Sequence, residues 1–163
     1  MDEHTDDAAL ATYLRRHVAG AEAALGMTKA LLDSETEPDV TAFLERLVDA
    51  IDRERGVVVA ALSQLDEGPG LVARGLDVAS NVAMKVKDVL PTDAPTELEG
   101  LEALAVGVWG KRLLWGTLMT VAELDERFRD LPLEELSRQA DDQERELVRL
   151  RQRAIRAAVI HAA

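Results

Sequence analysis

Four polar residues stand among the apolar positions of the predicted helices, and their types could support chemistry. They are His17, Glu54, Lys111 and Gln143. A buried lysine or glutamate must be paired with an opposite charge, or it loses its own charge. We therefore expect an ion pair between Glu54 and Lys111, with Gln143 and His17 supplying hydrogen bonds around it.

This buried polar layer has two interpretations. It can fix the register and pairing of the helices, as buried polar groups do in some proteins. It can also be a binding or catalytic centre, and three aromatic residues would then be its neighbours, namely Tyr13, Trp109 and Trp115. The apolar face of the first helix can be drawn in two ways. One places His17 on that face, and the other places it at the edge.

A metal site is a further alternative, because Glu22 and Glu102 also lie near apolar helix faces. Carboxylates from these residues and Glu54, with the imidazole of His17, could in principle hold iron. A single glutamate at the boundary of a helix face is otherwise a solvated side chain. The chain has no cysteine, so disulfides and thiolate metal sites are excluded.

Apolar residues recur every three or four positions along most of the chain, which is typical of helices packed against a core. Thr5 can cap the first helix, Pro38 suits the start of the second, and Thr96 with Glu99 forms a capping box for the fourth. Gly20, like Gly26, is expected where helices pack closely. The predicted helices span residues 5–33, 39–65, 71–89 and 96–122, and a fifth fills the chain after Pro132.

Glycine and proline breaks at residues 68–70 and 91–95 isolate the shorter helix at 71–89. This order predicts a four-helix bundle with one long crossover, in which the helices at 39–65 and 96–122 run parallel. Counting residues from the helix ends then places His17, Glu54, Lys111 and Gln143 in one layer, within about 6 Å along the bundle axis.

The composition predicts a single all-α domain over residues 1–163. Aromatic residues make up only 3% of the chain, while its formal net charge is −12. That acidity disfavours nucleic-acid binding, which depends on neutralising phosphates. The acidic amino terminus and short apolar runs predict neither a signal peptide nor a membrane span, so we expect a cytoplasmic protein.

Two motifs carry a resemblance to a known family. They read YLxxHxAG from Tyr13 and LExLxxGVxGKxxLW from Leu101. With the helix order, they make the chain similar to an uncharacterised bacterial group within the ferritin-like superfamily. The resemblance covers nearly the whole chain and implies a four-helix bundle with a long crossover carrying a fifth, shorter helix.

The di-iron site of that superfamily needs two Glu-x-x-His motifs and two further glutamates. None of the three histidines here (His4, His17 and His161) follows a glutamate by three residues. The resemblance therefore implies a bundle whose metal site has become a salt-bridge layer, without a cofactor.

From these observations we expect a non-enzymatic protein with a structural or protein-interaction role. Three alternatives remain open. An iron-binding protein or oxidase would use the glutamates named above, and a small-molecule binder would have a pocket beside Lys111 and Trp115. A regulator or adaptor would expose an apolar patch. No partner can be named from the sequence, and a homodimer is the arrangement we consider. We expect the protein to bind neither nucleic acid nor a membrane.

Overall fold

The structure is a computed structural model that describes residues 4–65 and 96–160. Within these residues it contains helices and no strand. The long helices are α1 (Asp7–Ser34), α2 (Pro38–Ser63), α4 (Glu97–Leu124) and α5 (Leu133–Ala158), and a short 3-10 helix, η1 (Glu126–Phe128), follows α4. The predicted helix at 71–89 lies outside the described residues.

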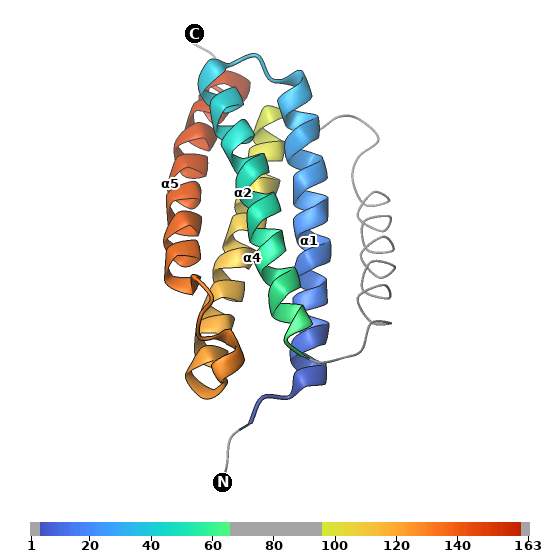
Figure 1. Ribbon diagram of the computed structural model, residues 1–163. Coiled ribbons are helices and arrows are strands. Elements are labelled where there is room, and N and C mark those ends of the chain that lie inside the picture. Colours follow the sequence, from blue (N-terminus) through green and yellow to red (C-terminus); the bar gives the residue numbers. More distant parts are fainter. Residues whose placement is uncertain (1–3, 66–95, 161–163) are drawn as a thin grey trace.

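The direction of the helices agrees with the predicted order. In Figure 1, α1 and α5 run one way along the bundle, while α2 and α4 run together in the opposite direction. The end of α2 and the beginning of α4 therefore lie at opposite ends of the bundle. Because α2 and α4 run parallel, the bundle is not a simple up-and-down arrangement.

Helix ends follow local chemistry. Pro38 is at the first turn of α2, and the capping box of α4 is complete, since Glu99 N–H donates to Thr96 Oγ1 at 3.3 Å and Thr96 N–H donates to Glu99 at 2.9 Å. The prediction that Thr5 caps α1 is wrong. The cap is Asp6, whose carboxylate accepts from the backbone N–H of Ala9 at 3.0 Å.

The core is made of aliphatic side chains from all four long helices. Only two buried residues of the described chain are polar, Thr28 and Glu54. The Thr28 hydroxyl donates to the carbonyl oxygen of Ala24 in its own helix, at 2.7 Å, so its polarity is satisfied locally. Glu54 needs partners from other helices, because a helix offers a side-chain carboxylate no free N–H in its interior.

The glycines do not all serve packing. A Cβ at Gly20 or Gly26 would meet no atom within 4 Å, so the expectation of close packing at these positions is wrong. At Gly100, by contrast, a Cβ would collide with the side chain of Leu31, so α1 and α4 pack closely there.

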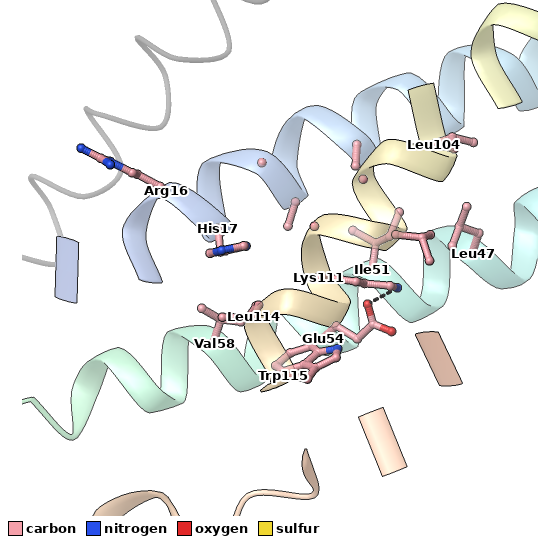
Figure 2. Close-up of a pocket in the computed structure, with 16 residues that line it drawn as sticks. Arg16, His17, Leu47, Ile51, Glu54, Val58, Leu104, Lys111, Leu114 and Trp115 are labelled. Atoms are coloured by element: carbon pink, nitrogen blue, oxygen red, sulfur yellow. Dashed lines mark hydrogen bonds and ion pairs between the residues drawn. The ribbon is translucent and has the colours of Figure 1, made fainter. Parts of the chain in front are cut away.

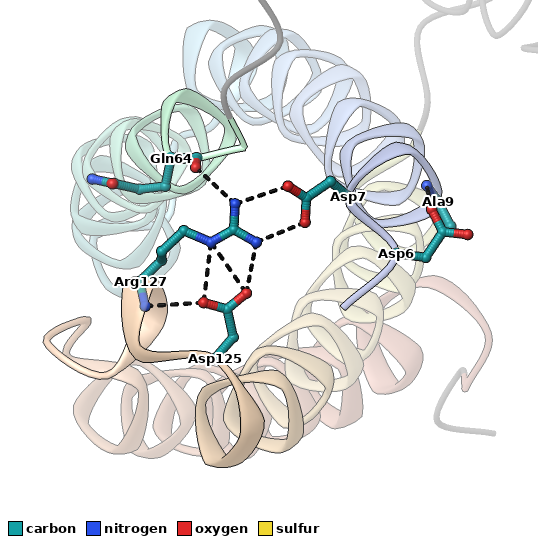
Figure 3. A network of polar contacts seen from close by, with 6 residues as sticks. All are labelled: Asp6, Asp7, Ala9, Gln64, Asp125 and Arg127. Carbon is teal, nitrogen blue, oxygen red and sulfur yellow. Dashed lines mark hydrogen bonds and ion pairs between the residues drawn. The ribbon is translucent and has the colours of Figure 1, made fainter. Parts of the chain in front are cut away.

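At the other end of the bundle, where α1 begins and α2 and α4 end, Arg127 forms a cluster of polar contacts (Figure 3). The guanidinium of Arg127 donates to both carboxylate oxygens of Asp7 at 2.6 and 2.8 Å, to Asp125 at 2.7 Å and to the carbonyl oxygen of Gln64 at 3.2 Å. Its Nε donates to Asp125 at 3.1 Å, so all five N–H groups have acceptors. The ends of α1, α2 and α4 are joined through this one side chain.

None of the helices within residues 4–65 and 96–160 has the length and apolar character required to cross a bilayer.

Candidate functional site

The centre of the bundle contains an ion pair between α2 and α4. Lys111 Nζ lies 2.6 Å from Glu54 Oε2, and the two side chains are 13% and 6% exposed (Figure 2). The other carboxylate oxygen of Glu54 accepts from Gln143 Nε2 of α5 at 3.4 Å. The structure thus brings together three of the four residues of the predicted polar layer.

His17 is half-buried beside this group without bonding to it. Its ring lies edge-on to that of Tyr13, with the ring centroids 4.6 Å apart, and Tyr13 Oη lies 3.2 Å from Thr117 Oγ1 of α4. Burial lowers the pKa of His17, so its imidazole is neutral at pH 7. His17 therefore contributes a neutral polar ring and no charge to the centre.

A cavity of about 300 Å³ between α1, α2 and α4 is lined in part by this ion pair. Its polar lining residues are Lys111, Glu54, His17 and Arg16 (Figure 2). Its other walls are mainly aliphatic, with side chains from α1 (Ala21, Ala24), α2 (Leu47, Ile51, Val58) and α4 (Leu104, Val108, Leu114). An apolar cavity with a few convergent polar groups is the usual form of a small-molecule site.

Three glycines keep the cavity accessible. Gly20 of α1 and Gly107 and Gly110 of α4 line it, and a Cβ at any of them would meet no atom within 4 Å. From the sequence, a pocket beside Lys111 and Trp115 was expected only under the alternative of a small-molecule binder. The available signal was the pair of glycines on the side of the predicted helix that carries Lys111.

Burial also alters the ionisation of Lys111. Its pKa is lowered by burial, which disfavours the charged ammonium, while the nearby Glu54 carboxylate opposes the shift. An ammonium has three N–H donors, and the structure gives Lys111 one acceptor, Glu54. The buried indole Nε1 of Trp115 also has no partner among the described residues.

The two tryptophans have different positions. Trp115 is 1% exposed and lines the cavity, whereas Trp109 is 55% exposed. The prediction that Trp109 neighbours the polar layer is wrong, because residues two positions apart point to opposite sides of a helix. Trp109 instead lies between exposed Val106 and Leu113 on the outer face of α4.

The residues considered for iron do not converge. Glu22 pairs with Arg55 at 3.4 Å and Glu102 pairs with Arg151 at 2.7 Å, while Glu54 pairs with Lys111. Each carboxylate thus has its own cation. In the part of the chain that the structure describes, no three acidic or histidine side chains are grouped to hold a metal ion.

Compared with protein-family models, curated proteins and solved structures, the chain matches none of them. The geometry of the cavity and its ion pair therefore carries the functional argument.

Proposed function

We propose that this protein is a non-enzymatic helical bundle that binds a small, largely apolar molecule in the cavity beside Lys111. The observation that carries the proposal is the cavity of about 300 Å³, whose aliphatic walls lead to one ion pair. That volume is at the lower end of the range for ligand pockets, so the ligand is small. Its apolar part would contact the aliphatic walls, and a polar group would face Lys111.

A ferritin-like origin is part of the proposal. The parallel direction of α2 and α4 supports it, as do the two motifs described above. In this interpretation the Lys111–Glu54 ion pair replaces a metal centre. The cation of Lys111 would repel a bound metal ion, and the same ion pair would keep the helices in register.

The binding test uses heptan-1-ol, an apolar probe without a carbonyl group. Trp109→Phe leaves Trp115 as the tryptophan that reports on the cavity, so binding should change its fluorescence. Gly107→Leu places a side chain in the cavity and should weaken binding at least tenfold. Gly116→Leu is the matched control, because a Cβ at Gly116 also meets open space but this residue does not line the cavity. Equal binding to both variants, or none at millimolar probe, would contradict the proposal.

A second function, protein interaction, is favoured by the outer face of α4. Val106, Trp109 and Leu113 are 70%, 55% and 49% exposed, and their spacing places them on one side of the helix. Contiguous exposed apolar residues often mark an interface. A homodimer through this face would dissociate in Trp109→Glu, as measured by sedimentation, whereas an unchanged mass would exclude this face as the contact.

A further inference from the structure

We propose that Lys111 captures a small apolar aldehyde in the cavity as an imine, with Glu54 as the counter-ion. This inference rests on the proposed binding function and adds to it the class of ligand and a covalent step. Because imine formation is reversible, the aldehyde can be bound and released unchanged, so the inference requires no catalytic turnover.

The position of Lys111 meets the first requirement, access to the ligand. Lys111 lines the cavity and is only 13% exposed, so an aldehyde in the cavity would contact the amine while most solvent is excluded. The carboxylate of Glu54 is the partner closest to the amine, at 2.6 Å (Figure 2). The amine therefore lies between a carboxylate and an apolar space.

The amine must also lose a proton before it can attack. Burial lowers the pKa of Lys111, as it does for lysines that act as nucleophiles in apolar pockets. Glu54 Oε2 is within hydrogen-bond distance of Nζ and can accept that proton directly. This transfer takes place within the ion pair, so it leaves the net charge of the buried site unchanged.

The reaction balances with the groups present. The lone pair of Nζ attacks the aldehyde carbon, a C–N bond forms as the C=O π bond breaks, and one proton moves from Nζ to the oxygen to give a carbinolamine. Glu54 then returns its proton to the hydroxyl group, which leaves as water. The ion pair and the aldehyde thus give a protonated imine, a carboxylate and water, and no oxidant or reductant is needed.

The ion pair favours the product. A protonated imine has one positive charge on the nitrogen of Lys111, as the ammonium did. The carboxylate of Glu54 therefore still has a cation beside it. The buried pair therefore stays neutral overall, and the cost of burying an unpaired charge does not arise.

The surroundings select the class of aldehyde. The cavity walls are mainly aliphatic, and the charged residues of the lining are Lys111, Glu54 and Arg16, of which Arg16 is exposed. Most of the enclosed surface is therefore available to an alkyl chain. A short aliphatic aldehyde fits both the volume and these walls.

The experiment uses hexanal with sodium cyanoborohydride at pH 7, which converts an imine into a stable secondary amine. Peptide mapping by mass spectrometry then compares Lys111 with Lys29, an exposed lysine of α1. We expect Lys111 to be alkylated at least tenfold faster than Lys29. Alkylation of Lys111 at or below the rate of Lys29 would overturn the inference.

Two variants separate this result from simple unfolding and from the binding function. Gly107→Leu keeps Lys111 and Glu54 but fills the cavity, so labelling of Lys111 should fall at least tenfold, while Gly116→Leu should label normally. Labelling that persists in Gly107→Leu would overturn the assignment to the cavity. If heptan-1-ol binds but hexanal does not label Lys111, the imine is refuted and the binding function stands. If heptan-1-ol does not bind, the binding function fails as well.

Discussion

Replacing Lys111 with methionine should destabilise the bundle by about 3–4 kcal/mol at pH 7. Methionine keeps much of the length of lysine but leaves Glu54, which is 6% exposed, without a cation. Gln143 remains as a donor at 3.4 Å. A buried carboxylate can avoid its unpaired charge by taking up a proton. At pH 7 this costs about 1.4 kcal/mol for each pH unit above an ordinary carboxyl pKa of about 4.3, or about 3.7 kcal/mol. Breaking buried ion pairs generally costs about 3–5 kcal/mol, which agrees.

Because a proton on Glu54 replaces the missing cation, the stability of Lys111→Met should depend on pH. The folded variant holds a proton on Glu54 that the unfolded chain releases above about pH 4.3. The free energy of unfolding should therefore fall as pH rises from 5 to 7, by up to about 1.4 kcal/mol per pH unit. The wild-type protein keeps its buried charge balance without that proton, so this decline should be specific to the variant.

Urea melts followed by far-ultraviolet circular dichroism measure these effects. Glu54→Gln should be milder than Lys111→Met, because its amide still forms hydrogen bonds, and Lys111→Met with Glu54→Leu should recover much of the loss. Arg151→Met is the control, since Arg151 and Glu102 form a pair with both side chains 44% exposed, and it should cost about 0–1 kcal/mol. If Lys111→Met lies within that range and shows no pH dependence, the buried ion pair is refuted.

Three further predictions concern other parts of the bundle. Arg127→Ala should lower the free energy of unfolding by about 1–2 kcal/mol, because charge-assisted hydrogen bonds to a partly exposed cation are lost. Arg127 lowers the pKa of Asp125 to about 2, so this stabilisation is present above about pH 4 and is lost as pH falls toward 2; melts across that range should show a smaller loss in Arg127→Ala than in wild type. Gly116→Ala should stabilise α4 by about 0.5–1 kcal/mol, since the new Cβ meets open space, whereas Gly100→Ala should destabilise by about 1 kcal/mol because it collides with Leu31; a gain in urea melts for Gly100→Ala would contradict the packing there. Purified protein should contain no stoichiometric iron, manganese or zinc by elemental analysis, and two tightly bound metal atoms per chain would contradict the arrangement of paired carboxylates.

Most of the fold could be predicted from the sequence because its signals are local. The spacing of apolar residues identified the four described long helices, and Pro38 and the Thr96–Glu99 capping box identified two of their starts. Asp6 was missed as the cap of α1 because two adjacent residues, Thr5 and Asp6, can both supply a capping oxygen. Which one does so depends on the backbone conformation of the preceding residues.

The candidate site could be predicted only in part. Counting residues along parallel helices was sufficient to bring Glu54 and Lys111 to one level, because the rise per residue is constant. The rotation of each helix about its axis decides whether a side chain such as Trp109 points inward, and it is set by packing against the other helices, which periodicity does not specify. Glu22 and Glu102 were considered as metal ligands because their partners, which come from other helices, cannot be read from local spacing.

By itself, then, the sequence determined the helices, their direction and the pairing of one buried cation with one buried anion. These follow from the periodicity of apolar residues, the helix caps and the cost of burying an unpaired charge. The cavity was decided only by the tertiary structure. Its volume depends on the distance between α1 and α4 and on which side chains face each other across the gap, and Gly20, Gly107 and Gly110 leave that space open only when the two helices are placed together.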